Sequence, residues 1–166
     1  MAKTRVAGTV ILMILALAAI VGCDLMAPQE PQVTHWAPAL SPDGQSIVYA
    51  SSTENGLALF RLDLATSRED QLTFNDAPNW SPQWSPDGTR VVYTSRREEN
   101  VDLYILVLET METLRLTTDA ADDINPHWGS DGLVYFNSNR SGDWEIHAID
   151  PLTSVMRQLT SRETAP

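Results

Sequence analysis

Three aspartates recur along the chain at a constant step of 44 residues: Asp43, Asp87 and Asp131. Carboxylates are good ligands for divalent cations, so a repeated aspartate raises the question of a metal site. Each aspartate is followed by glycine, however, and the first two stand in the tetrapeptide Ser-Pro-Asp-Gly. Proline presets the second position of a β-turn, and glycine accepts the left-handed backbone that follows. We therefore expect these aspartates to form turns, and we predict no metal and no cofactor.

The combinations of residues that support catalysis are not found. The sequence has no Gly-x-Ser-x-Gly elbow, no His-Glu-x-x-His pair and no glycine-rich loop of the phosphate-binding kind. Serine, histidine and aspartate occur, but no spacing aligns them as a nucleophile, a base and an orienting acid. The sequence thus predicts a protein that is not an enzyme.

The single cysteine, Cys23, stands at the end of an apolar segment. Lys3 and Arg5 precede an uncharged run over residues 6–22, the order of features found in a secretory signal. Ile20-Val21-Gly22-Cys23 resembles the lipobox of bacterial lipoproteins, and this resemblance implies that Cys23 is acylated and becomes the mature N-terminus. The alternative is an uncleaved membrane helix. Both alternatives place the rest of the chain outside the cytoplasmic membrane, in the periplasm or on the outer cell surface.

The charge of the chain excludes one class of partner. The formal net charge is −11, and no lysine occurs after Lys3. Binding to phosphates needs clustered lysine and arginine, so nucleic acid is not an expected partner. Residues 23–35 are rich in proline and glutamine and are expected to be an extended tether between the signal peptide, residues 1–22, and a folded domain.

The turn tetrapeptides divide the rest of the chain into three repeats. A fixed step in this range is the signature of a repeat architecture. We place the repeats at residues 36–79, 80–123 and 124–166, the third being one residue shorter after its turn. Each repeat contains four short runs rich in β-branched and aromatic residues, and none has a helical period. We expect an all-β fold of three four-stranded antiparallel blades, a partial β-propeller, preceded by an N-terminal signal helix.

Two segments carry a resemblance to a known family. Trp84-Ser85-Pro86-Asp87-Gly88 with Val91-Val92-Tyr93, and Asn137–Ile146 closed by Gln158-Leu159-Thr160, resemble the TolB-like propeller repeat. The resemblance implies a propeller and a role as an interaction partner in the cell envelope. Together with the lipobox, which is a departure from that family, it leads us to expect a lipid-anchored, non-catalytic module that mediates protein–protein interaction. The alternatives are a propeller that binds carbohydrate or another small ligand, and a propeller fragment of a larger peptidase or lyase.

Candidate binding residues lie on the loops and on the first strand of each repeat. They are Arg96, Arg97, Arg140, Trp84, Trp128 and His127. The arginines belong to the more charged end of the blades, where the loops between second and third strands lie. Arg97 and Arg140 occupy matching positions, where arginine more often links units than contacts a ligand. Trp36, Trp80, Trp84 and Trp128 are expected first as core and channel lining, and a stacking surface for sugar is the alternative. His127 is expected to point into the channel.

Three blades do not close a ring, since propellers have about four to eight. The residues of the second repeat's third strand are apolar on both faces, as expected for a blade covered on each side. On the corresponding strand of the first repeat stand Arg61 and Asp63, which suggest an exposed outer blade. Two copies related by a two-fold axis would form a six-bladed ring, which makes a homodimer one expectation. The other is a truncated gene whose fourth blade is missing.

Overall fold

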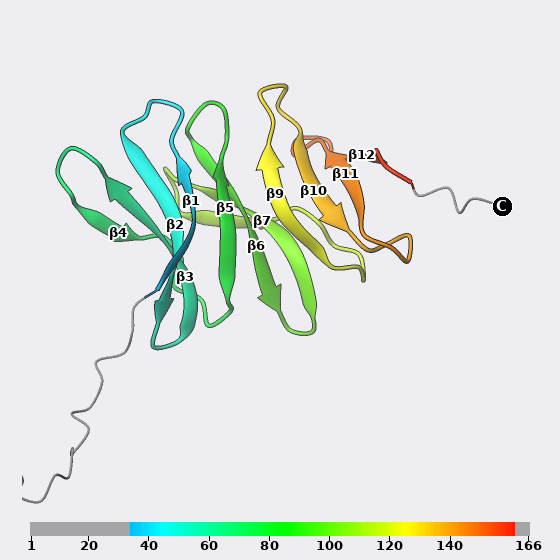
Figure 1. The fold of residues 1–166 in the computed structure, drawn as a ribbon, viewed down its shortest axis with the longest axis horizontal. Helices are drawn as coiled ribbons and strands as arrows, with labels where there is room; N and C mark the ends of the chain where they lie inside the picture. Colours follow the sequence, from blue (N-terminus) through cyan, green and yellow to red (C-terminus); the bar gives the residue numbers. More distant parts are fainter. Residues whose placement is uncertain (1–33, 162–166) are drawn as a thin grey trace, which may run out of the picture. The chain divides into compact units, whose positions relative to one another are not determined.

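The computed structural model describes residues 34–161, and within this range every regular element is a β-strand (Figure 1). The expected all-β class with three four-stranded antiparallel sheets is confirmed. The signal helix, Cys23 and most of the tether lie outside the described residues.

Each sheet is one repeat of the sequence, and we call the sheets the first, second and third blade. The first blade consists of β1 (His35–Leu40), β2 (Ser46–Thr53), β3 (Gly56–Asp63) and β4 (Glu69–Gln71). The second consists of β5 (Asn79–Trp84), β6 (Arg90–Arg97), β7 (Asn100–Val107) and β8 (Glu112–Arg115). The third consists of β9 (Asp123–Trp128), β10 (Val134–Ser138), β11 (Glu145–Ile149) and β12 (Met156–Gln158). Strands are hydrogen-bonded in chain order, so each blade is a simple meander.

The repeated turn connects the first and second strands of each blade. In the first blade the Gly44 N–H donates to the Ser41 carbonyl at 2.9 Å, and Gly44 has a φ of +70°. The Asp43 carboxylate accepts hydrogen bonds from the Ser41 hydroxyl at 2.6 Å and the Gln45 N–H at 3.0 Å. The side chain that resembled a metal ligand is therefore occupied by its own turn.

The second turn is built in the same way, and its carboxylate titrates abnormally. Hydrogen bonds from the Ser85 hydroxyl and the Thr89 N–H lower the pKa of Asp87 to about 2. The ionised form thus stabilises the fold above about pH 4, and this contribution is lost as the pH falls toward 2. The free energy of unfolding of Asp87→Asn should be lower than that of the parent at neutral pH, with a gap that closes between these pH values. Urea titrations across this range measure the gap, and a constant gap would contradict the assignment.

The third turn is one residue shorter, as the sequence predicts. The Gly129 N–H donates to Leu133, four residues on, whereas the Ser41 N–H donates to Ser46, five residues on. In the shorter loop Tyr135 packs over the turn, and its hydroxyl donates to Asp131 at 2.7 Å. These contacts leave no room for a side chain at position 129.

Restoring the serine found in the other two turns should therefore destabilise the protein. A Cβ at Gly129 would lie 2.5 Å from the Asp131 Oδ1 atom and 2.8 Å from the Tyr135 ring. We expect Gly129→Ser to lower the free energy of unfolding by about 1–3 kcal/mol, the usual cost of overpacking. Urea denaturation followed by circular dichroism measures this cost. Equal or greater stability of the variant would show that Tyr135 moves aside at no cost.

The first strand of each blade carries a bulge before its proline. Ala37, Ser81 and Asn125 have positive φ angles of 49°, 51° and 54°. The pairing with the second strand shifts at this point in all three blades. The bulge fits the proline that follows, because proline cannot donate a hydrogen bond to the ladder.

The closing Leu-Thr pair of each repeat fastens the third strand. The hydroxyls of Thr73, Thr117 and Thr160 each accept a hydrogen bond from a backbone N–H of β3, β7 or β11, at 2.9–3.0 Å. The preceding leucine is buried in the first two blades and exposed in the third, where Leu159 is 44% exposed.

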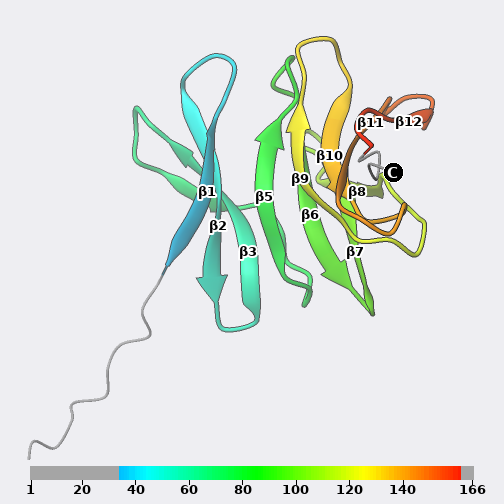
Figure 2. The same ribbon diagram turned by 45° about the vertical axis from the view of Figure 1, so that its right-hand side comes forward.

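Two apolar cores lie between the blades (Figure 2). The inner strands β5 and β9 make the closest approach, since each contacts three strands of the blade before it. The first core joins Leu59 and Leu72 to Val91, Tyr93 and other residues of the second blade. The second core joins the second blade to the third in the same way. The expectation that the second blade is covered on both faces is confirmed.

The first blade has one face that no other described blade covers, but Arg61 and Asp63 do not lie on it. Side chains alternate along a strand, and Leu59, on the same face as Arg61, is buried against the second blade. The face of the first blade that no other described blade covers is the opposite one, which carries Phe60 and Leu62. This face is mainly apolar, with Glu69 as its charged strand residue.

Candidate functional site

The more charged end of the blades contains two hollows that involve a candidate arginine. The loops β2–β3 and β6–β7 meet there with the connections between blades, as the meander requires. Arg96 and Arg97 end β6 at this place, and Arg140 lies in the loop between β10 and β11. The three arginines nevertheless have different surroundings. Arg96 remains a candidate for binding, whereas Arg97 and Arg140 hold parts of the fold together.

Arg96 borders a hollow of about 570 Å³ between the first and second blades. The apolar walls are the side chains of Trp36, Leu57 and Trp80. Trp36 is 46% exposed, an unusual value for so large an apolar side chain. The remaining lining residues are Ala37, Pro78 and Ser81. We call this site the tryptophan hollow.

Arg96 also belongs to a second hollow of about 500 Å³ beside the first. Its lining includes the charged residues Asp76, Arg97 and Glu98 together with Ala77 and Pro78. Within residues 34–161 the Arg96 side chain makes no hydrogen bond or ion pair, although its backbone N–H donates to Pro78. The exposed Arg96 guanidinium thus stands between an aromatic surface and a surface with charges of both signs.

Arg97 is held within its own blade. Its guanidinium lies 3.9 Å from the centre of the Tyr104 ring and donates to the Tyr93 hydroxyl at 3.3 Å. Stacking on one tyrosine and bonding to another covers the aromatic side chains of the second blade.

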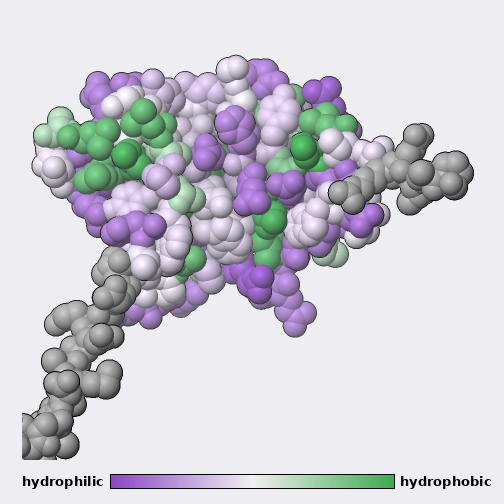
Figure 3. All heavy atoms as spheres, viewed as in Figure 1, coloured by the Kyte–Doolittle hydropathy of each residue, from purple (hydrophilic) through white to green (hydrophobic). Residues whose placement is uncertain are grey.

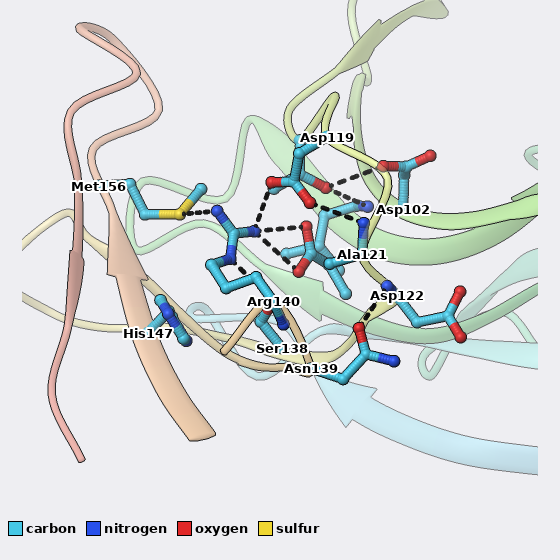
Figure 4. A network of polar contacts seen from close by, with 12 residues as sticks. Asp102, Asp119, Ala121, Asp122, Ser138, Asn139, Arg140, His147 and Met156 are labelled. Carbon is cyan, nitrogen blue, oxygen red and sulfur yellow. Dashed lines mark hydrogen bonds and ion pairs between the residues drawn. The ribbon is translucent and has the colours of Figure 1, made fainter. Parts of the chain in front are cut away.

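Arg140, the matching residue of the third blade, is the centre of an ion-pair network (Figure 4). Its guanidinium contacts both carboxylate oxygens of Asp123 at 3.0 Å and the Asp119 carboxylate at 2.7 Å. Asp123 is fully buried. A second pair lies nearby, since Arg115 contacts the buried Asp102 at 2.7 Å. Burial raises the pKa of Asp102, while the Arg115 guanidinium opposes that shift.

The other three candidates lie along the inner strands. The Trp84 Nε1–H donates to the Ala39 carbonyl of the first blade at 3.0 Å. Trp128 is buried in the second core with the Arg90 guanidinium 4.9 Å above its ring. His127 is exposed, on the face of the third blade that no other described blade covers. The structure thus brings none of these three residues into the tryptophan hollow.

The hollow as a unit was not predicted, because its walls come from three strands of two blades. Trp36 and Trp80 were expected first as core or channel lining, with a stacking surface for sugar as the alternative. The available signal was the repeated Trp-x-Pro of the first strands, since the bulge before the proline decides where the tryptophan side chain points.

No group of three or more possible metal-ligating side chains is found among residues 34–161. In the same range there is no helix with the length and apolar character needed to cross a membrane.

Comparison with known families identifies the fold. The model of the TolB beta propeller domain matches residues 23–165, and the chain belongs to this family. No curated relative matches the sequence.

Solved structures agree with this assignment. TolB from Acinetobacter baumannii is 27% identical, with a TM-score of 0.70 over 78% of this chain and 33% of that one. A putative TolB from Agrobacterium tumefaciens is 22% identical, with a TM-score of 0.71 over 78% and 50%. The chain thus spans one third to one half of the TolB structures it matches. A puromycin hydrolase, 18% identical with a TM-score of 0.65 over 82% and 22%, shows the same fold.

Proposed function

We propose that this protein is a lipid-anchored, non-catalytic propeller module that binds another protein in the cell envelope, outside the cytoplasmic membrane. The observation that carries the proposal is the tryptophan hollow with Arg96 at its edge. Tryptophan and arginine are the residues most enriched where binding energy between proteins is concentrated. The likeness to TolB structures supports an envelope role.

The shape and charge of the site favour a protein segment as the ligand. The tryptophan hollow has room for an apolar side chain, and the Arg96 guanidinium can donate hydrogen bonds to a carboxylate or a backbone carbonyl beside it. Asp76 and Glu98 in the neighbouring hollow extend the surface toward a cationic group. A segment with an apolar residue flanked by charges of both signs satisfies all three.

A photo-crosslinking residue at position 96 tests this proposal in intact cells. Position 110 is the control, because Thr110 is exposed in the turn between β7 and β8, at the opposite end of the same blade. We expect one discrete adduct with a protein from position 96, absent from position 110 and weakened by Trp36→Ala. Equal labelling from both positions, or none from position 96, would contradict the proposal.

The anchor is tested separately through Cys23. Each acyl methylene buried in the membrane contributes about 0.8 kcal/mol to the free energy of binding, and stable anchoring takes more than one chain or signal. We expect the parent protein in the membrane fraction and Cys23→Ala in the soluble fraction, with loss of metabolic labelling by palmitate. Membrane retention of unlabelled Cys23→Ala would show that the apolar segment itself is the anchor.

Carbohydrate binding is the second candidate, because the paired tryptophans offer apolar surface to a sugar ring. Calorimetric titration with soluble peptidoglycan fragments distinguishes the two functions. Binding that Trp36→Ala abolishes and Arg96→Ala leaves intact would favour the sugar.

A further inference from the structure

Five positions of each blade form the surface that packs against the blade before it, and we call this surface the upstream face. In the second blade they are Trp84, Val91, Tyr93, Tyr104 and Leu106. In the third they are Trp128, Val134, Phe136, His147 and Ile149. All except Trp84, which is partly buried, are at most 6% exposed. An upstream face is therefore a docking surface for another blade.

The first blade has the same apolar face with no described blade against it. Its five residues are Leu40, Ile47, Tyr49, Phe60 and Leu62. Each is more exposed than its counterpart in the third blade, and Leu40 is 59% exposed where Trp128 is 6% exposed. Figure 3 shows an apolar area over the blade that contains β2, β3 and β4.

The third blade has the complementary surface, which we call its downstream face. In the first two blades the downstream face contains a buried pair, Leu59 with Leu72 and Leu103 with Leu116. The matching pair in the third blade, Ile146 and Leu159, is 42% and 44% exposed. The hydrogen bond from the Leu159 N–H to the Ile146 carbonyl shows that these two residues lie side by side, as the matching pairs do.

The charges on the two uncovered faces are complementary. The upstream face of the first blade has one charged strand residue, Glu69, which accepts a hydrogen bond from the Tyr49 hydroxyl. The downstream face of the third blade also has one, Arg157, beside Ala148. Opposite signs at the edges of two apolar faces favour their association.

We propose that the occupant of each uncovered face is a second copy of this chain. The first blade of each copy packs against the third blade of the other, repeating the contacts of the two cores within the chain. Two such contacts related by a two-fold axis give a closed ring of six blades. Six is the only multiple of three within the range of about four to eight blades found in propellers.

A cysteine pair tests the contact in the full-length, membrane-bound protein. Within the chain the Trp84 side chain of the second blade reaches Ala39 of the first blade. Leu40 holds the position of Trp84 in the first blade, and His127 holds the position of Ala39 in the third. Across the proposed contact, Leu40 of one copy should therefore lie beside His127 of the other. Both are exposed. We expect a Leu40→Cys chain and a tagged His127→Cys chain to crosslink when expressed together. Neither variant alone should crosslink, which also controls for Cys23, and Thr110→Cys in place of His127→Cys should give no product.

Sedimentation of the purified protein tests the number of copies. We expect a dimer for the parent and for Met111→Asp, since Met111 is 43% exposed in the turn between β7 and β8 of the central blade and so lies on neither uncovered face. Phe60→Asp should be a folded monomer. If Phe60→Asp does not fold, Ile146→Asp on the other face replaces it, with Leu152→Asp as its control. A monomeric parent, or an assembly larger than two copies, would overturn the proposal.

The outcome is independent of the proposed function. Arg96 belongs to the central blade and to neither uncovered face. If no protein is crosslinked from position 96, the proposed function fails but the proposed dimer does not. Equally, a monomer that still crosslinks a protein from position 96 would overturn only the ring.

Discussion

Replacing Arg140 by alanine should destabilise the protein by about 3–5 kcal/mol, the cost of breaking a buried ion pair from one side. The reason is Asp123, which is fully buried and whose two carboxylate oxygens both accept hydrogen bonds from Arg140. Without the guanidinium that carboxylate remains buried and unpaired. The exposed pair of Arg68 and Asp70 is the matched comparison, since the Arg68 side chain is 74% exposed. Arg68→Ala should cost less than about 1 kcal/mol.

A double variant separates the unpaired charge from lost packing. Arg140→Met keeps much of the apolar stem, and Asp123→Asn removes the charge left behind. If the charge is the cause, the free energy of unfolding of the double variant should exceed that of Arg140→Met alone, because removing both charges leaves nothing uncompensated. Urea denaturation of the four proteins gives the coupling energy. Additive losses would show that Arg140 acts through its contacts with Met156 and Ser138 instead.

The blades could be predicted from the sequence because one local rule repeats. A Ser-Pro-Asp-Gly turn needs only its own four residues, and the apolar runs after it need only strand propensity. The third turn departs from the motif at Gly129, and the structure accounts for this through the shorter loop and Tyr135.

The faces of the strands were harder to predict, because a bulge breaks their alternation. Trp80 and Trp84 are four residues apart, so strict alternation places them on one face. The shift in pairing puts Trp80 opposite Thr94 and Trp84 opposite Val91, which lie on different faces of β6. Both tryptophans pack against the first core, but Trp80 borders the hollow, whereas the Trp84 indole donates a hydrogen bond to Ala39.

The candidate site depends on the same local detail. Arg96, Arg97 and Arg140 have the same residue type and similar places in their repeats. Only the partners brought by other strands distinguish them, since Tyr104 holds Arg97 and Asp123 holds Arg140. Such partners come from non-local pairing, which a motif of four residues does not specify.

Trp84→Ala should lower the free energy of unfolding by about 3 kcal/mol, the second large effect we expect. This value is at the low end for a core aromatic residue because the Trp84 side chain is only partly buried. The variant removes the packing of the indole on the first core and the hydrogen bond to Ala39. Trp84→Phe keeps most of the packing and should lose about 1 kcal/mol, the net value of one hydrogen bond.

Trp36 provides the control that separates stability from binding. It is 46% exposed on the hollow, so Trp36→Ala should leave the free energy of unfolding within about 1 kcal/mol of the parent. Circular dichroism is the suitable signal, because fluorescence changes with every tryptophan removed. If Trp84→Ala costs no more than Trp36→Ala, Trp84 does not join the blades. A ligand lost only in Trp36→Ala then identifies the binding surface, whereas a ligand lost in Trp84→Ala reports a damaged scaffold.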